Sequence, residues 1–291
     1  MTSPRISGKT AVYGIIGDPV DHSMSPIIQN AAFRGMCLDA IYVPFHVKKS
    51  DLKQAVEGLA ATRIRGFNVT APHKVSIIRY LNSLDRNAVD IQSVNTVINR
   101  NGVLVGFNTD GIGALKAIKV KRLHYASVLI FGAGGAARAI AHAYAPKVMA
   151  IRIVNRTLSK GKMLERSIRK KLKRNVEIEA VSLVDKRISE YVRSADIIVN
   201  ASSMGMNNKN KLPVKTDWFQ SRQVVFDIVY NPVETEFLRL AKSAGAGTIN
   251  GLEMLLNQGC CSFKLWTGLN APITLMRRVM IDQLAETYAQ S

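Results

Sequence analysis

Short apolar runs alternate with amphipathic segments along most of the chain. The runs at residues 11–17, 40–47 and 66–70 are rich in β-branched and aromatic residues and predict strands. Between them, residues 25–36 and 50–61 carry apolar residues at helical spacing and predict helices. Strands that alternate with helices favour an α/β fold with largely parallel sheets.

One segment departs from this alternation. Residues 93–110 alternate apolar and polar positions around Asn101-Gly102, the dipeptide most typical of a tight hairpin turn. We therefore expect two antiparallel strands here, followed by a helix at residues 111–118.

The alternating pattern starts again in the middle of the chain. Residues 127–132 predict a buried strand, and an alanine-rich helix follows at 136–145. Four more strands are expected, at residues 150–155, 176–181, 195–202 and 224–230. This restart places a domain boundary near residue 113, so that residues 113–251 form a second domain.

The end of the chain has a different pattern. Two long helices are predicted at residues 252–268 and 272–290, and no predicted strand lies near them in the sequence for them to pack against. We expect this segment to fold back onto the first domain. The first domain would then comprise residues 1–112 and 252–291.

Composition is that of a soluble globular protein, with 47% hydrophobic and 21% charged residues in 291. No apolar run reaches the roughly 18 residues of a membrane span, and the first residues lack the apolar stretch of a secretory signal. These observations predict a cytoplasmic protein without a membrane partner. Three cysteines without a CxxC pair, and histidines without ligand spacing, predict no metal site.

Charge is the unusual property. Lys and Arg number 40 against 21 Asp and Glu, which gives a net charge of +19 and attracts anions. The densest basic run, residues 166–175, contains no aromatic residue that could stack on a base. We interpret it as a solvated helix face and expect no nucleic-acid partner.

A glycine-rich turn follows the strand at 127–132. Gly132-x-Gly134-x-x-Ala137 has the form of a dinucleotide-binding fingerprint, in which the first glycine permits the turn and the second lets the backbone approach a pyrophosphate. The strand before it and the helix after it are the context that this motif requires. A merely structural glycine turn is the alternative.

The end of the next strand indicates which nucleotide binds. An NAD site would place an acidic residue there, whereas this chain has Asn155, Arg156, Thr157 and Lys160. A guanidinium group suits a 2′-phosphate, so the sequence favours NADP. The alternative is that Arg156 is one of many surface bases.

Polar residues gather where the strands of the first domain end. In open α/β sheets, ligands bind beyond the carboxyl ends of strands. Each residue has an ordinary explanation as a helix cap or turn residue, but their convergence predicts a binding site. These residues are Ser23, Ser25, Asn68, Thr70, Lys74, Asn95 and Asp110.

Lys74 is placed by the pattern in the first turn of a helix, where the helix dipole disfavours a cation. A neighbouring Asp110 would offset this. A lysine held by an aspartate can give a proton to an alkoxide and take it back, which is what reversible carbonyl reduction by a hydride requires.

The chain resembles the shikimate dehydrogenase family over nearly its whole length. The resemblance rests on ten motifs in one order, among them "GDPVDHSMSPIIQN", "GFNVTAPHK", "SVNTV", "GFNTDG", "GAGGAAR", "FDIVYNPVETEFL" and "NGLEMLLNQG". It implies NADPH-dependent, reversible reduction of 3-dehydroshikimate to shikimate in aromatic amino acid biosynthesis. It also implies a substrate domain, completed by C-terminal helices, and a Rossmann NADP domain.

The resemblance also implies a role for each motif residue. Lys74 and Asp110 would be the catalytic pair, and Ser23 and Ser25 would hold the substrate carboxylate. The remaining substrate contacts would be Asn68, Thr70, Asn95, Tyr230 and Gln258. NADP would be held by Gly132, Ala133, Gly134, Gly135, Ala136, Asn155, Arg156, Thr157, Lys160, Ile228 and Gly251.

Two positions depart from the family pattern. Gln29 stands where the first motif usually has histidine, and Arg86 stands where an acidic residue is frequent. We expect the first to tune the site, and the second puts one cofactor-side contact in doubt. Whether the protein is a monomer or a homodimer stays open.

Three other functions remain as alternatives. A quinate/shikimate dehydrogenase with relaxed substrate or cofactor choice would keep the fold, but Arg156 argues for NADP and the Ser23/Ser25 pair for shikimate. A basic nucleic-acid-binding module would have no use for Lys74 and Asp110. A catalytically silent NADPH sensor would require that pair to be broken.

Overall fold

The computed structural model describes residues 6–118, 123–206 and 210–289. The chain divides into two compact units. Unit 1 comprises Met1–Thr109 and Leu255–Ser291, and unit 2 comprises Asp110–Met254. Each unit is built on its own six-stranded sheet, so the expected α/β fold with two largely parallel sheets is confirmed.

The sheet of unit 1 has the order β2-β1-β3-β5-β6-β4. The first three strands in this order are mutually parallel, and β5 runs antiparallel to both β3 and β6. The bounds are β1 Ala11–Gly17, β2 Ala40–His46, β3 Gly66–Val69, β4 Ser83–Leu84, β5 Thr96–Arg100 and β6 Val103–Phe107.

The expected hairpin joins β5 and β6. Asn101 and Gly102 both have positive φ, at 53° and 92°, which is the backbone conformation that favours Asn-Gly in a two-residue turn. The Asn99 side chain accepts a hydrogen bond from the Gly102 N–H at 2.7 Å and closes the turn.

Helices cover the sheet of unit 1. The helices α2 (Leu52–Ala61) and α3 (Arg86–Ile91) enclose a core with β3 and β5 that includes Phe67 and Val97. The helices α1 (Ser25–Gly35), α9 (Leu252–Thr267) and α10 (Ile273–Ala289) also pack together. Phe33 of α1 contacts Phe263 of α9, the Cys260 Sγ of α9 lies 3.7 Å from the Met276 Sδ of α10, and α10 packs against α1.

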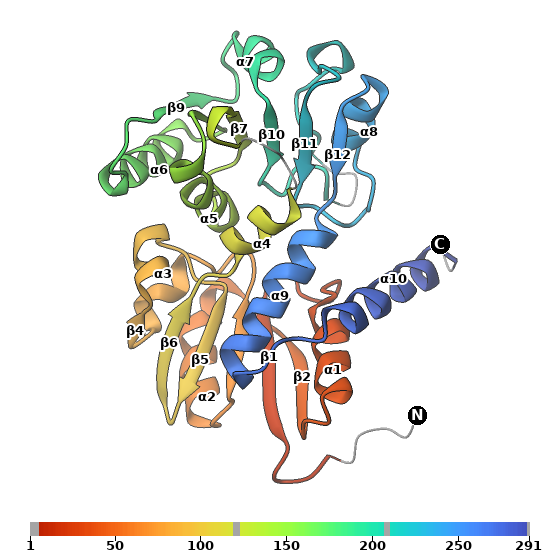
Figure 1. Cartoon of the computed structure of the whole chain (residues 1–291). Helices are drawn as coiled ribbons and strands as arrows, with labels where there is room; N and C mark the ends of the chain where they lie inside the picture. Colours follow the sequence, from red (N-terminus) through yellow and green to blue (C-terminus); the bar gives the residue numbers. More distant parts are fainter. Residues whose placement is uncertain (1–5, 119–122, 207–209, 290–291) are drawn as a thin grey trace. The chain divides into compact units, whose positions relative to one another are not determined.

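Helix α9 begins in unit 2 and continues into unit 1, where it lies on the sheet (Figure 1). An aromatic cluster of Tyr13, Phe33, Phe263 and Trp266 anchors it, with ring centroids 5.0–5.6 Å apart in successive pairs. The Trp266 indole N–H also donates to the Val97 carbonyl at 3.0 Å. The end of the chain therefore returns to complete unit 1.

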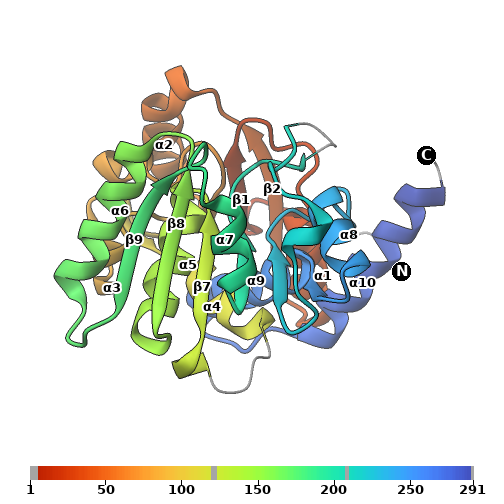
Figure 2. The same ribbon diagram turned by 90° about the horizontal axis from the view of Figure 1, so that it is seen from above.

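The sheet of unit 2 is entirely parallel, in the order β12-β11-β10-β7-β8-β9. Viewed from above, β9, β8 and β7 lie side by side (Figure 2). This is the doubly wound order, in which the strand sequence reverses direction at β7 and β10. The bounds are β7 Ser127–Phe131, β8 Ala150–Asn155, β9 Glu177–Ser182, β10 Ile197–Asn200, β11 Val224–Asp227 and β12 Gly247–Ile249.

Both faces of this sheet are buried. Along β7, Val128 and Ile130 belong to one core, whereas Leu129 and Phe131 belong to the other. The first core is closed by α4 (Asp110–Ala117), α5 (Gly135–Tyr144) and α6 (Leu158–Lys171). The second is closed by α7 (Ile188–Ser194) and α8 (Glu236–Ser243). Apolar residues on both sides of a strand are typical of a parallel sheet.

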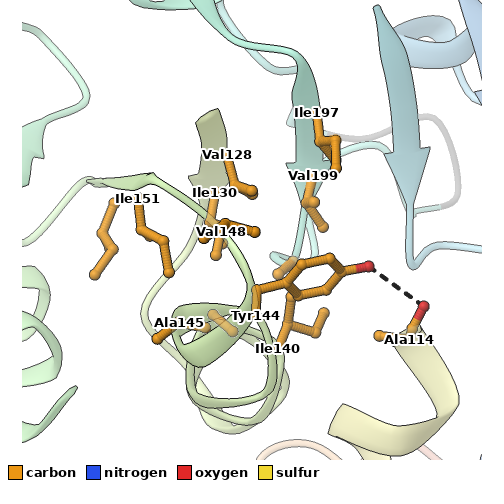
Figure 3. Packing of buried hydrophobic residues seen from close by; sticks show 14 of the residues in the cluster. Ala114, Val128, Ile130, Ile140, Tyr144, Ala145, Val148, Ile151, Ile197 and Val199 are labelled. Atoms are coloured by element: carbon orange, nitrogen blue, oxygen red, sulfur yellow. Dashed lines mark hydrogen bonds between the residues drawn. The ribbon is translucent and has the colours of Figure 1, made fainter. Parts of the chain in front are cut away.

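Tyr144 fills the centre of the first core. Figure 3 shows its ring among Val128, Ile140 and Val199, with the hydroxyl directed at the Ala114 carbonyl, 3.4 Å away. Burial raises the pKa of Tyr144 well above its usual value. Its hydrogen bond joins α5 to α4, which directly follows Thr109 in the chain.

One expected element has a different form. The segment after β3 is a turn through Lys74, and the helix that follows is a short 3₁₀ helix, Ser76–Tyr80, rather than an α-helix that includes Lys74. The His73 N–H bonds to the Thr70 carbonyl and the Ile77 N–H to the His73 carbonyl, so local turns hold this segment. The prediction that Lys74 lies in the first turn of a helix is therefore wrong.

In the described part of the chain, no helix combines the length and the apolar character that crossing a bilayer requires.

Candidate active site

Ser23 and Ser25 lie together at the start of α1. The Ser25 N–H donates to the Ser23 Oγ at 3.3 Å, and the Ser23 N–H bonds to the Val20 carbonyl. Ser25 is the first residue of the helix, after Met24 at the N-cap position, so it is not the cap. Two hydroxyl groups at a helix start form a suitable site for a carboxylate.

Asn68 is buried in β3 and forms four side-chain hydrogen bonds. Its amide nitrogen donates to the Asn95 carbonyl, the Thr96 hydroxyl and the Ser262 hydroxyl at 2.9–3.1 Å. Its amide oxygen accepts from the Tyr42 hydroxyl at 2.7 Å. The side chain is thus held on both its donor and acceptor sides by neighbouring protein groups.

Asn95 and Gln258 are joined directly. The Asn95 amide nitrogen donates to the Gln258 Oε1 at 3.2 Å and to the Thr109 hydroxyl at 2.8 Å. The Asn95 amide oxygen accepts from the Thr109 N–H at 2.8 Å. Because Asn68 also reaches the Asn95 carbonyl, three of the predicted substrate residues belong to one hydrogen-bond network.

Ser262 belongs to this network but was not predicted from the sequence. It is fully buried, contacts the Thr96 hydroxyl at 2.8 Å and donates to the Gln258 carbonyl at 3.1 Å. A signal for it did exist, because Gln258, Ser262 and Trp266 recur at every fourth position of α9 and so share one helix face. That face is the one that meets β3 and β5.

Lys74 and Thr70 lie just beyond the end of β3. The Lys74 carbonyl accepts from the Val94 N–H at 2.8 Å, and the Thr70 N–H donates to the Ile16 carbonyl at 3.0 Å. Lys74 is partly buried. Asn95 follows Val94 and bonds to Thr109.

Asp110 directly follows Thr109, whose N–H donates to the Asn95 amide oxygen, and it is the first residue of unit 2. Asp110 is 2% exposed and begins α4.

Unit 2 carries the glycine-rich turn between β7 and α5. Gly132 has a φ of 117°, and an added Cβ would lie 2.8 Å from the Ala201 carbonyl oxygen, so only glycine fits. Gly134 is exposed at the N-cap of α5, and among the described residues a Cβ there would meet nothing within 4 Å. This space above a helix start is where a pyrophosphate fits, and Ala133, Gly135 and Ala136 border it along the chain.

The cationic residues lie at the end of the neighbouring strand, β8. Asn155 ends the strand, and its side-chain amide donates to the Thr157 carbonyl at 2.8 Å. Thr157 occupies the N-cap position of α6, and Arg156, Thr157 and Lys160 are all exposed. Two cationic side chains around an open helix start fit a phosphate group.

Ile228 and Gly251 lie against each other. The Gly251 N–H donates to the Val229 carbonyl at 3.3 Å, and an added Cβ at Gly251 would collide with the Ile228 carbonyl oxygen. Tyr230 follows two residues after Ile228 and is half-buried. The segment after β11 thus carries two residues predicted to contact ligands, Ile228 and Tyr230. Its backbone lies so close to residue 251 that only glycine fits there.

The two departures from the family pattern have different surroundings. Gln29 is fully buried, and its amide nitrogen donates to the Gly259 carbonyl at 3.0 Å, next to Gln258. Arg86 is exposed at the start of α3, which is capped by the Asp85 side chain through the N–H groups of Asn87 and Ala88. The Gln29 side chain therefore links α1 to α9 and helps to fix the position of α9.

Three family models cover most of the chain. Residues 15–97 match the shikimate dehydrogenase substrate binding domain, residues 114–243 match shikimate / quinate 5-dehydrogenase, and residues 251–281 match the shikimate 5′-dehydrogenase C-terminal domain. Among curated proteins, shikimate dehydrogenase (NADP(+)) of Pyrococcus furiosus is 46% identical over 97% of this chain and 99% of the relative.

Solved structures agree with these matches. A crystal structure of a shikimate dehydrogenase in complex with NADP⁺ superimposes with a TM-score of 0.87, at 41% identity over 96% of this chain and 98% of that chain. Quinate dehydrogenase from Corynebacterium glutamicum in complex with NAD gives a TM-score of 0.83, at 27% identity over 94% and 99%. Family models match most of the chain, and relatives at 41–46% identity cover nearly all of it. The chain therefore belongs to the shikimate dehydrogenase family.

Proposed function

We propose that this protein is an NADP-dependent shikimate dehydrogenase that reversibly reduces 3-dehydroshikimate to shikimate in aromatic amino acid biosynthesis. The observation that carries the proposal is the hydrogen-bond network of Asn68, Asn95 and Gln258 at the strand ends of unit 1, bonded to the segments that bear Lys74 and Asp110. A polyhydroxylated ring suits such a polar surface, because each amide can donate to or accept from a hydroxyl group.

Unit 1 is the proposed substrate domain. The substrate carboxylate would lie at the start of α1, with hydrogen bonds from the Ser23 and Ser25 hydroxyl groups. The ring hydroxyls would contact Thr70, Asn95 and Gln258 of unit 1. Tyr230, which belongs to unit 2, would also contact them. Asn68 would act mainly by holding Asn95, since its own amide is already bonded to the protein.

Unit 2 is the proposed NADP domain. The turn at residues 132–136 would bind the pyrophosphate. Arg156 and Lys160 would bind the 2′-phosphate, and Asn155 and Thr157 would border the same phosphate site. Ile228 and Gly251 would border the nicotinamide end. When bound, NADPH supplies the hydride that the substrate carbonyl accepts.

Lys74 would supply the proton. As the carbonyl oxygen gains negative charge, the Lys74 ammonium group donates a proton to it, and in the reverse direction the amine removes the proton from the hydroxyl. Asp110 would keep the ammonium group oriented and offset its charge. The two residues thus act as one proton-transfer unit.

Quinate is the second candidate substrate, because a quinate dehydrogenase shares this fold. Initial rates with shikimate and quinate, each with NADP⁺ and NAD⁺, separate the possibilities through the absorbance of the reduced nicotinamide. We expect the highest kcat/KM for shikimate with NADP⁺. A higher kcat/KM for quinate, or for NAD⁺, would contradict the proposed specificity.

We further propose a cytoplasmic enzyme that acts as a monomer or a homodimer and binds no nucleic acid. Light scattering after size exclusion, with and without a DNA duplex at physiological salt, tests the assembly state and the absence of nucleic-acid binding. Co-elution with the duplex, or a larger assembly, would contradict it.

A further inference from the structure

A carboxyl group that the proposed mechanism does not use is buried in unit 2. Asp227 is the last residue of β11 and is 0% exposed. Its Oδ1 accepts from the Asn200 side chain and from the Val229 N–H, both at 2.9 Å, and its Oδ2 accepts from the Thr235 hydroxyl at 2.7 Å. These three donors are neutral, although a buried carboxylate is normally paired with a cation.

Asn200 connects Asp227 to the segment after the neighbouring strand, β10. Its amide nitrogen donates to the Met204 carbonyl at 2.8 Å, and its amide oxygen accepts from the Ser202 N–H and hydroxyl. Because Asn200 is fully buried, it fixes residues 200–204 from inside. Ala201 in this segment is the residue whose carbonyl approaches Gly132.

Thr235 connects Asp227 to helix α8. It is the N-cap of α8, and its hydroxyl oxygen accepts from the Leu238 N–H at 3.3 Å while its hydrogen is donated to Asp227. Residues 228–234 are therefore tied at both ends to one carboxyl group. Ile228 and Tyr230 lie within this segment.

The carboxyl group is retained at an energetic cost. Burial raises the pKa of Asp227 to about 6, even though hydrogen bonds from Thr235, Val229 and Asn200 lower it. A neutral side chain would avoid this cost. However, only a carboxylate accepts on both oxygens, which this arrangement of donors requires.

We propose that Asp227 is a positioning residue, which with Asn200 and Thr235 fixes the segments after β10 and β11 and so orients Ile228 and Tyr230 for hydride transfer. This inference rests on the proposed function, because it assigns those two residues to the nicotinamide and substrate side. Orientation of reacting groups is sensitive to small displacements, so loosening this segment should lower kcat more than it weakens binding.

The experiment compares four variants of the full-length protein. Asp227→Asn replaces one acceptor oxygen by a donor, and Thr235→Val removes the hydroxyl at nearly constant shape, whereas Thr235→Ser retains it. Gln223→Leu is the matched control, because Gln223 is a buried polar residue at the opposite end of β11 that bonds to the Val192 and Ala195 carbonyls. For each protein we would measure kcat and KM for shikimate oxidation, the thermal midpoint, and the Kd of 2′,5′-ADP, a probe of the adenosine end alone.

We expect Asp227→Asn and Thr235→Val to lower kcat by about tenfold or more, with the Kd of 2′,5′-ADP changed less than about twofold. Thr235→Ser should restore kcat, and Gln223→Leu should lose thermal stability while keeping kcat. The inference is overturned if kcat stays at the wild-type value in both variants, or if Gln223→Leu loses kcat equally.

Folding failures also decide the matter. If Asp227→Asn does not fold, the comparison of kcat between Thr235→Val and Thr235→Ser tests the inference. If neither Asp227→Asn nor Thr235→Val folds, the cluster serves stability alone and the inference is overturned. A wild-type protein that does not oxidise shikimate with NADP⁺ would instead overturn the proposed function, which distinguishes the two failures.

Discussion

Replacing Asp227 with asparagine should change how stability depends on pH. The native pKa of this carboxyl group, about 6, lies above its ordinary value of 3.8 because burial disfavours the charged form. Its stabilising contribution is therefore greatest below the ordinary pKa and is lost as the pH rises through about 6. Asparagine does not titrate, so the variant lacks this loss.

The size of the effect follows from the two pKa values. The difference between 3.8 and about 6 corresponds to about 3 kcal/mol of unfolding free energy at neutral pH. From about pH 4.5 to about pH 7.5, the linkage relation gives a change of about 2 kcal/mol from this group alone. Other titrating groups are common to both proteins and cancel in the comparison. Relative to wild type, the variant should thus gain about 2 kcal/mol over this interval.

The assay must report on unit 2 separately, because two compact units need not unfold together. The chain has two tryptophans, Trp218 in unit 2 and Trp266 in unit 1. With Trp266→Phe as the background, Trp218 fluorescence during urea unfolding follows unit 2. Unfolding free energies of both proteins would be measured at the two pH values.

The reasoning is refuted if the free-energy difference between variant and wild type is the same at both pH values. It is also refuted if the variant becomes relatively less stable as the pH rises. Either result would mean that Asp227 is not a buried carboxyl group with a raised pKa.

Four further outcomes are expected. Arg156→Ala should raise the Kd of NADPH by about ten- to a hundredfold and leave that of NADH nearly unchanged, because one charge-assisted contact is worth about 1.5–3 kcal/mol; isothermal titration of both cofactors checks this, and an equal loss with both contradicts it. Ser262→Ala should cost about 1–3 kcal/mol of unfolding free energy, since it deprives buried Asn68 and Thr96 of a partner; urea unfolding with an unchanged midpoint would count against it. Gly111→Ala should lower the thermal midpoint, because the new Cβ would lie 2.8 Å from a carbonyl oxygen of α5; calorimetry that finds no decrease would show that the helices can separate. kcat/KM should fall as salt increases, since a net charge of +19 attracts both anionic reactants, and stopped-flow rates independent of ionic strength would contradict this.

Local patterns were enough to predict the elements that position the candidate site. The parallel strands, the Asn101-Gly102 turn and the helix start at Gly134 depend on residues close in sequence, and the structure contains each of them. The sequence could not predict which side chains Asn68 meets, because Ser262 is 194 positions away. Lys74 was misplaced in a helix because a turn and a helix start have similar composition over five residues.

Buried polar clusters were the least predictable feature. Asp227 looked like one residue of a buried strand, and its partners Asn200 and Thr235 come from two other segments. Their meeting depends on the parallel order of β10 and β11, which strand-by-strand patterns do not specify.

The central claim is that Lys74 exchanges a proton with the substrate oxygen, and the most direct test is the turnover of Lys74→Ala with shikimate and NADP⁺, with NADPH affinity as the control. The account predicts a decrease in kcat of about 10²–10⁴-fold while the Kd of NADPH stays near the wild-type value. A variant that turns over shikimate at close to the wild-type rate would contradict it.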